Sequence, residues 1–379
     1  MQKNKFYTDL NLINLPIFST SKRIKRKSEK EIIEIRKNNK KTKLIITYPQ
    51  KKLTFFDRKI LASIEYIFTN HLSLAKIEKS FNNEYEKELE KVKQKHSIKS
   101  TDEIGESEKQ LILFSAMENV QKEYKLYLTL KEINDLIFNK SYLHKEIKQS
   151  LIKLSQTIIY QTSHYFIDNS VLEIPGMQLL NVIISRHKNR DMLTITLNPF
   201  HMINIVQKKV TRADLRLLNS FRQPIAGRLS ELLNKALYGS KTFNKSKVVY
   251  DYSYICDYLQ IEKRKAESLI LQQLKKPFNE LIEKKIIINW LLVKNLFGYE
   301  VSFYHSHNFY EDYYNMLDKK TKIKINKGLA QIIKNESVYT EFKNKIEMYF
   351  EKTNFKTETE LDQVKPFYSK YLYLTEYMK

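Results

Sequence analysis

Apolar positions along the first half of the chain alternate between a helical and a strand-like spacing. Steps of three and four residues predict amphipathic helices at 53–68, 129–138 and 141–160. Thr54 and Thr129 are the predicted N-caps of the first two helices. Strand-like runs at 178–187 and 192–199 flank the polar sequence KNRD and predict a hairpin. With short strands at 44–48 and before Thr129, this is the element order of a winged-helix domain.

The same order recurs in the second half of the chain. The spacing predicts a long helix at 212–237 that stops at Gly239. The elements expected after it are a strand at 247–250, helices at 251–260 and 261–285, and a hairpin of strands at 286–293 and 299–305. The repeat is one of architecture and not of sequence.

These patterns predict an α+β fold, mostly helical, with two tandem winged-helix domains and a helical C-terminal extension. The predicted segments are a basic N-terminal arm at 1–43, a first winged-helix domain at 44–209, a second at 210–309 and the extension at 310–379. A charged stretch at about 74–110 is expected to be an insertion, either a solvated helix or a flexible excursion. The basic arm is expected to be mobile.

The helix at 261–285 carries Pro277 in its interior, which costs roughly 3 kcal/mol in a helix. We expect the proline to divide the helix into a half that contacts DNA and a half that packs under the hairpin. The residues predicted to share its apolar face are Ala266, Leu269, Ile270, Leu274 and Leu281.

Charge narrows the classes of partner. The 379 residues contain 66 Lys and Arg against 43 Asp and Glu, a net charge of +23. This excess favours a polyanion, nucleic acid before an anionic membrane, although a lysine-rich composition alone would also raise it. No signal peptide or apolar run of membrane-spanning length is present, so we expect a soluble cytoplasmic protein.

Several chemistries are excluded or disfavoured by composition. Cys256 is the only cysteine, which excludes an intrachain disulfide or a cysteine zinc site and predicts a buried thiol. None of the six glycines forms a GxxxxGK phosphate loop. We expect no metal, no cofactor and no catalytic residue.

The third helix of each unit is the one that a helix-turn-helix places in the major groove. Arg and Gln suit base edges, and Lys and Ser suit phosphates. The outer face of the second unit's helix carries Arg264, Lys265, Ser268, Gln272, Lys275 and Lys276. The outer face of the first unit's helix carries Lys145, Lys148, Gln149, Lys153 and Gln156, and the hairpin tip carries Arg186, His187, Lys188 and Arg190. Any solvated helix in a lysine-rich protein shows similar residues. Ile152 also lies on the outer face of the first unit's helix, which weakens the prediction for that helix.

Three stretches carry a family resemblance. The helix at 261–285 combines Lys263-Arg264-Lys265, Leu274, Pro277 and Asn279-Glu280-Leu281-Ile282. It follows TRADLRLLNSFRQPIAGRLSELLNKAL, and LTFFDRKILASIEYIF opens the first unit. Over roughly 44–309 the chain resembles plasmid replication initiator (Rep) proteins of the iteron-binding, double winged-helix family. The charged insertion, Leu229-Ser230 in place of an aromatic residue, and the C-terminal extension depart from the family's pattern.

The resemblance implies a non-enzymatic protein that binds repeated origin sites in double-stranded DNA, bends or melts the origin and so initiates plasmid replication. The second unit would bind one face of each site and the first unit the adjacent groove. The implied partners are origin DNA, a host initiator, the replicative helicase and, through the first unit, a second copy of the chain in a monomer–dimer equilibrium.

Two alternatives stay open. A winged-helix transcriptional repressor has the same domains. A rolling-circle nicking enzyme would use His305 and His307 for a metal and a downstream tyrosine such as Tyr368 or Tyr371. The serine between the histidines and the lack of an acidic ligand at a typical spacing argue against the second.

Overall fold

The structure is a computed structural model, and the residues that it describes fall into two compact units. The units are Met1–Gly239, Tyr250–Ile286 and Lys294–Glu300 in one, and Ser240–Val249, Ile287–Val293 and Val301–Lys379 in the other. The described residues are 5–9, 13, 17–20, 30–37, 40–47, 52–97, 100–101, 104–137, 143–167, 170–187, 190–206, 210–243, 245–296, 298–305 and 322–323. Lys188, His307, both named tyrosines and nearly all of the predicted C-terminal extension lie outside them. The predicted domain boundaries stay predictions.

The first set of elements has the winged-helix order. Its helices and strands are α2 (Phe55–His71), β4 (Leu126–Thr129), α5 (Leu130–Ile137), α6 (His144–Gln156), β7 (Leu180–His187) and β8 (Arg190–Leu197). The strands form an antiparallel sheet in the order β4-β8-β7. Helices and sheet share one buried apolar core, whose members include Ile60, Ile64, Ile133, Ile147, Leu151, Leu193, Ile195 and Leu197.

Both predicted N-caps are confirmed. The backbone N–H of Thr54 donates to Asp57 Oδ2 at 2.7 Å, which completes a capping box at the start of α2. At α5, Thr129 and Glu132 cap each other: the Thr129 N–H donates to Glu132 Oε2 at 2.6 Å, and the Glu132 N–H donates to Thr129 Oγ1 at 3.3 Å. Local sequence alone therefore sets where these helices begin.

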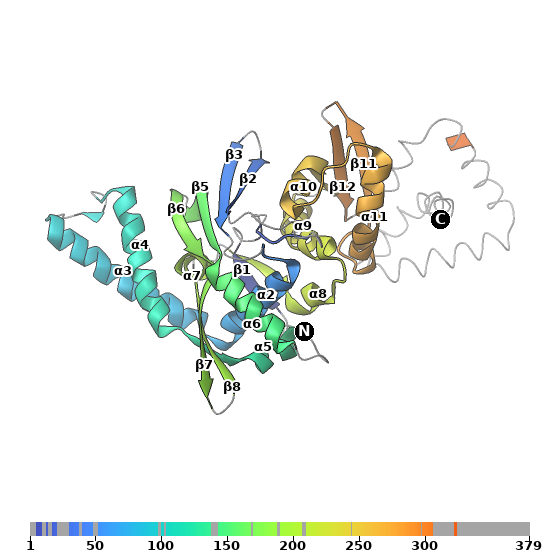
Figure 1. Ribbon diagram of the computed structural model, residues 1–379. Helices are drawn as coiled ribbons and strands as arrows, with labels where there is room; N and C mark the ends of the chain where they lie inside the picture. Colours follow the sequence, from blue (N-terminus) through green and yellow to red (C-terminus); the bar gives the residue numbers. More distant parts are fainter. Residues whose placement is uncertain are drawn as a thin grey trace, which may run out of the picture. The chain divides into compact units, whose positions relative to one another are not determined.

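The charged insertion is a helical hairpin. Helices α3 (Leu74–His96) and α4 (Glu106–Glu123) pack against each other and precede β4 (Figure 1). Ser73 caps α3, whose Ile77 and Phe81 are buried. The insertion is thus helical, and it extends beyond the predicted end at 110.

A second sheet was not predicted as such, although one of its strands overlaps the strand expected at 44–48. Its four antiparallel strands are β2 (Lys30–Lys37), β3 (Lys40–Thr47), β5 (Ile158–Ile167) and β6 (Ser170–Gln178), in the order β2-β3-β5-β6. The prediction of a helix through 160 was wrong, because α6 ends at Gln156 and the following β-branched run pairs with β3, Ile158 opposite Thr47.

Part of the predicted basic arm is folded, so the expectation that the whole arm is mobile was wrong. Strand β1 (Lys5–Asp9) pairs antiparallel with β9 (Val210–Asp214), which follows α7 (Pro199–Val206). Phe6 and Thr8 of β1 are buried. The apolar Phe6 and the hydrogen-bonded Thr8 hydroxyl hold this strand in the core, which the surrounding lysines hid in the sequence.

After one additional short helix, the second set of elements repeats the order of the first. It consists of α8 (Leu215–Ser220), α9 (Pro224–Thr242), β10 (Lys247–Asp251), α10 (Tyr252–Leu259), α11 (Glu267–Glu283), β11 (Asn289–Asn295) and β12 (Gly298–Tyr304). Its sheet order, β10-β12-β11, matches that of the first sheet.

The single helix predicted at 212–237 is two helices. Pro224 disfavours a helical conformation at Gln223 and begins α9 itself, as proline often does. Gly239 does not end α9, which continues to Thr242. A glycine without a C-terminal cap only weakens a helix, and packing of α9 outweighs that cost.

Helix α11 is shorter at its start than predicted and is not divided by its proline. It begins at Glu267 and continues through the buried Pro277 to Glu283. The predicted division into two halves was therefore wrong. Burial of the Pro277 ring compensates for the hydrogen bond that its nitrogen cannot donate.

The fold is thus α+β, mostly helical, with small antiparallel sheets, and is consistent with winged-helix-like domains. Cys256 is fully buried, as predicted. Among the described helices, none combines the length and the apolar character needed to cross a bilayer.

Candidate nucleic-acid interface

A basic pocket lies between α5, α6 and the β7–β8 hairpin. We call it the α6–wing pocket; its volume is about 670 Å³. Its lining residues are Thr129, Leu130, Lys131, His144, Lys148, Arg186 and Asp191. Three permanent cations and a histidine surround one carboxylate, so the pocket carries net positive charge and suits a phosphate.

One ion pair connects the helix to the hairpin inside this pocket. Lys148 Nζ of α6 lies 3.0 Å from Asp191 Oδ2, and Asp191 stands opposite Arg186 in the β7–β8 ladder. Both side chains are partly exposed, so the pair is screened and contributes little to stability. Its effect is to hold the Lys148 ammonium beside Arg186.

The other residues predicted to contact DNA from the first winged-helix domain differ in their surroundings. Lys145, Gln149 and Arg186 are exposed, as a DNA contact requires. Lys153 instead pairs with the buried carboxylate of Asp57, and only 19% of its side chain is exposed. This lysine is engaged in the packing of α6 on α2, because Asp57 needs a cation where water is excluded.

The pocket also contains two residues that the sequence reasoning missed. Lys131 and His144 lie in the first turns of α5 and α6. The sequence reasoning considered the outer face of one helix at a time, so it gave these two residues no role in binding. Only the junction of two helix starts and the hairpin brings them beside Lys148.

The second basic surface is formed by α11 and the loop before it. Ser268, Gln272, Lys275 and Lys276 are exposed on the helix, as predicted. Arg264 and Lys265 are also exposed but precede the helix, so their predicted helical position was wrong. The Arg264 backbone N–H donates to the hydroxyl of Tyr252, 3.0 Å away, in the loop before the helix.

Three hydrogen bonds fix this loop against α10 and α11. Besides the Arg264 bond, the Tyr252 hydroxyl donates to Gln273 Oε1 at 2.7 Å, and Gln273 Nε2 donates to the Glu262 carbonyl at 3.0 Å. The Arg264 side chain pairs with Glu262 at 2.8 Å, and both are well exposed. Such a surface pair is weak enough for an acceptor group of DNA to replace the carboxylate.

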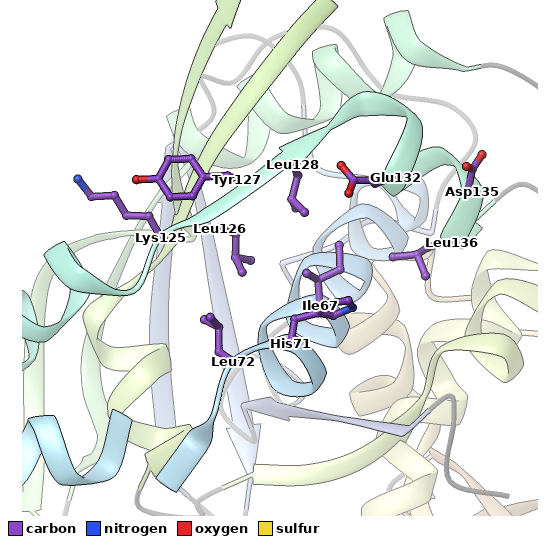
Figure 2. Close-up of a pocket in the computed structure, with 10 residues that line it drawn as sticks. All are labelled: Ile67, His71, Leu72, Lys125, Leu126, Tyr127, Leu128, Glu132, Asp135 and Leu136. Carbon is purple, nitrogen blue, oxygen red and sulfur yellow. The ribbon is translucent and has the colours of Figure 1, made fainter. Parts of the chain in front are cut away.

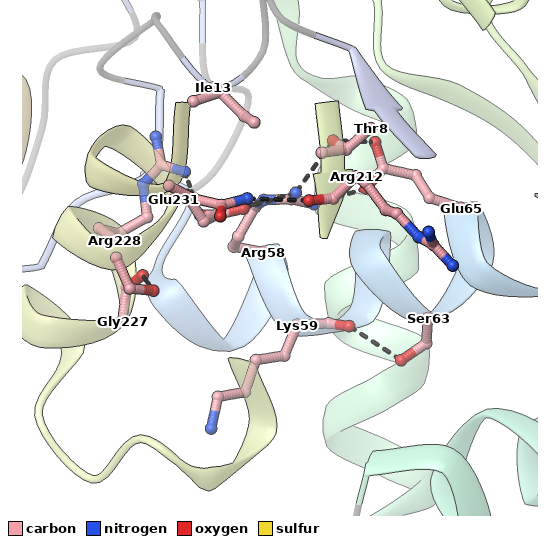
Figure 3. Close-up of polar contacts among 12 residues, drawn as sticks. Thr8, Ile13, Arg58, Lys59, Ser63, Glu65, Arg212, Gly227, Arg228 and Glu231 are labelled. Carbon is pink, nitrogen blue, oxygen red and sulfur yellow. Dashed lines mark hydrogen bonds and ion pairs between the residues drawn. The ribbon is translucent and has the colours of Figure 1, made fainter. Parts of the chain in front are cut away.

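A buried ionic network joins α2 to α9. Figure 3 shows Arg58 between the carboxylates of Glu65 and Glu231, which its guanidinium contacts at 2.8 and 2.7 Å. Arg228 forms a further ion pair with Glu231. Burial opposes ionisation of Glu231, but the two guanidinium groups outweigh it and lower its pKa.

Helix α11 is hydrogen-bonded to the residues that precede α9. The buried Glu280 carboxylate of α11 accepts hydrogen bonds from the backbone N–H groups of Arg222 and Gln223, at 2.7 and 2.9 Å. These donors precede the first turn of α9, where N–H groups lack helical partners. Glu280 therefore fixes α11 relative to α9. The outer face of α11 points away from this contact.

A separate apolar pocket of about 520 Å³ lies beside the edge strand β4 (Figure 2). Its lining residues are Ile67, His71, Leu72, Lys125, Leu126, Tyr127, Leu128, Glu132, Asp135 and Leu136. Glu132 is already engaged in the α5 cap. In the part of the chain that the structure describes, no cluster of three or more His, Cys, Asp or Glu has an arrangement that suits a metal ion.

The histidine considered for a nicking enzyme has a structural contact. His305 Nε2 lies 2.9 Å from the Ser240 hydroxyl. The His305 backbone N–H also donates to the carbonyl of Ser246, which ties the end of β12 to the start of β10. In the described residues His305 thus has a structural role, and its predicted metal-binding partner His307 lies outside them.

Comparison with known proteins gives distant structural similarities only. No protein-family model matches the chain, and no curated protein sequence does. The chain is similar to a crystal structure of domains 2 and 3 of RctB as selenomethionine derivatives, with a TM-score of 0.36 and 10% identity, covering 76% of this chain and 94% of that one. A second structure, RctB domains 2-3, matches with a TM-score of 0.35 and 12% identity, covering 77% and 96%. Similarity of this degree defines no function.

Proposed function

We propose that this chain is a sequence-specific, double-stranded DNA-binding protein that initiates plasmid replication from repeated origin sites. One observation carries the proposal: the last helix before the hairpin in each set, α6 and α11, carries exposed Lys and Gln side chains where a helix-turn-helix contacts DNA. The net charge of +23 supports it, because phosphate contacts supply much of the affinity for DNA.

The two sets act as tandem winged-helix units. The α11 surface contacts base edges in one major groove, and the α6–wing pocket binds a backbone phosphate beside an adjacent groove. Because α6 packs on α2 and α11 is fastened to α9, the ionic network between α2 and α9 keeps both reading helices in one arrangement. Such an arrangement suits one continuous site rather than two independent ones.

The protein acts by binding and carries out no chemistry of its own. By its resemblance to Rep proteins, it bends or melts the origin and recruits a host initiator and the replicative helicase. A second copy of the chain binds through the first winged-helix domain. A transcriptional repressor is the alternative, and two units within one chain favour the initiator.

DNA binding is tested with the full chain and a library of random duplexes, from which bound sequences are selected and then titrated against salt. We expect a selected site and a log–log slope of affinity against salt on the order of −6 to −9, for about 7–10 neutralised phosphates. Absence of duplex binding, or binding that salt does not weaken, would overturn the proposal.

Three variants test the assigned surfaces. Lys148→Ala and Arg186→Ala should each weaken binding to all sequences and reduce the salt slope by about one. Arg264→Ala should cost about 1–3 kcal/mol of binding free energy and relax the sequence preference, because arginine can form paired hydrogen bonds with a base edge. Lys91→Ala is the control, because Lys91 is an exposed residue of the α3–α4 hairpin; it should bind as the wild type does.

A replication assay separates an initiator from a repressor. Repeats of the selected site, spaced by about two helical turns, are placed on a plasmid without another origin. We expect the protein to maintain this plasmid and expect no maintenance when the repeats are scrambled. Binding without plasmid maintenance would assign the repressor function instead.

A further inference from the structure

Two leucines at the start of α11 are partly exposed to solvent. Leu269 and Leu271 are 45% and 36% exposed. The helix packs instead through Ile270, Leu274, Pro277, Phe278 and Leu281, all of them buried. The prediction that Leu269 belongs to the apolar face was wrong, because it lies about 100° around the helix from Ile270.

The leucines flank the polar strip that faces outward. Successive residues turn by about 100°, so the exposed Ser268, Gln272 and Lys275 share one side of α11. Leu269 borders this strip on one edge and Leu271 on the other. The first six residues of the helix thus present two apolar groups with the hydrogen-bonding groups of Ser268 and Gln272 between them.

The surroundings of the leucines favour DNA over an apolar protein partner. Lys275 and Lys276 follow on the same exposed surface, and Arg264 and Lys265 precede it. An apolar docking site for a protein would be expected to form a continuous patch, whereas these leucines are separated by polar side chains. A cationic rim around two isolated apolar groups suits a polyanion that offers small apolar groups of its own.

The major groove offers one such group. Among the base edges, only thymine presents a methyl group there, at C5, and apolar side chains contact it in specific complexes. A recognition helix approaches the bases with its N-terminal residues, which is where both leucines lie. The exposed carboxylate of Glu267 would be repelled by phosphates and is tolerated beside bases, where it accepts from cytosine N4.

We propose that Leu269 and Leu271 are specificity-determining residues that contact thymine C5-methyl groups in the site bound by α11. This inference rests on the proposed DNA-binding function. It predicts that the selected site contains thymines on both sides of the positions read by Gln272 and Lys275.

The test replaces thymine by deoxyuridine, one position at a time, in the duplex selected by the full chain. This change removes the methyl group and leaves every hydrogen-bonding group of the base in place. We expect the wild type to bind about three- to tenfold more weakly at one or two uridine positions, as the loss of one buried methyl group predicts. Leu269→Ala and Leu271→Ala should each bind the thymine duplex more weakly and lose the discrimination at one position.

A matched control separates methyl recognition from general weakening. Gln272→Ala should weaken binding but keep the difference between thymine and uridine. Each variant should unfold close to the wild-type temperature, because its side chain is at least partly exposed. If the chain binds the selected duplex and no uridine weakens binding, or the leucine variants keep the discrimination, this inference is wrong while the proposed function stands. Failure to bind any duplex overturns both.

Discussion

Arg58 of α2 and Glu231 of α9 form a fully buried ion pair between residues 173 positions apart in the sequence. The Arg58 Nη2 atom lies 2.7 Å from Glu231 Oε1, and Nε lies 2.8 Å from the same oxygen. Arg228 approaches the same carboxylate, and the guanidinium groups of Arg58 and Arg228 lie 5.9 and 5.4 Å from the centre of the Phe18 ring. The aromatic face and the shared carboxylate thus stabilise two neighbouring cations in the interior.

Removal of Glu231 should destabilise the protein strongly. Glu231→Ala leaves two buried guanidinium groups without this carboxylate, and we expect a loss of about 3–5 kcal/mol in the free energy of unfolding. Urea denaturation followed by circular dichroism measures it. Lys91→Ala removes an exposed pair with Glu88 and should cost less than about 1 kcal/mol. Equal losses in the two variants would contradict the role of the network.

Acid should weaken the stabilisation by Glu231. Its pKa is lowered in the folded state, so its contribution is complete above the unfolded-state value of about 4.3 and is lost as pH falls through the folded-state value. Glu65 acts in the opposite direction, because burial raises its pKa despite Arg58, and its contribution weakens as pH rises. Comparing the wild type with Glu231→Gln isolates the first effect. The difference in unfolding free energy should shrink below about pH 4, and a constant difference would contradict this assignment.

Two glycines of α9 should respond oppositely to alanine. A Cβ at Gly227 would overlap the ring of Phe55, so Gly227→Ala should separate α9 from α2 and destabilise the protein by about 1–3 kcal/mol. At Gly239 a Cβ meets no atom within 4 Å. Gly239→Ala should therefore stabilise the protein by about 0.5–1 kcal/mol through helix propensity alone. Thermal unfolding of both variants checks this, and stabilisation by Gly227→Ala would show that the helices do not approach as described.

Neutralising Asp191 should strengthen DNA binding. Among the described residues that line the α6–wing pocket, Asp191 is the one with an anionic side chain, and its carboxylate opposes a phosphate there. Asp191→Asn removes that charge and frees Lys148, so affinity for the selected duplex should rise about two- to fivefold at low salt. The gain should fade at high salt. Fluorescence anisotropy measures both, and unchanged or weaker binding at low salt would place the phosphate elsewhere.

The starts of α2 and α5 and the order of elements within the two sets were predictable because their signals are local. The caps at Thr54 and Thr129 use residues three positions apart, and the two winged-helix orders follow from periodicity. The exposure of Gln272 and Lys275 followed from the same periodicity. The break before Pro224 was missed although its signal, a proline, was present.

Other features were decided by the tertiary structure alone. From the sequence, Arg58 and Glu231 are only two charged residues on amphipathic helices. Strand β1 was not predicted because it lies in a segment rich in lysine. Lys153 was predicted for DNA but neutralises Asp57, whereas Lys131 and His144 meet Lys148 only where three elements join. Which distant residues pair with each other depends on which groups folding removes from water. The sequence gives the type of each group but not its surroundings, so such pairs cannot be predicted from it.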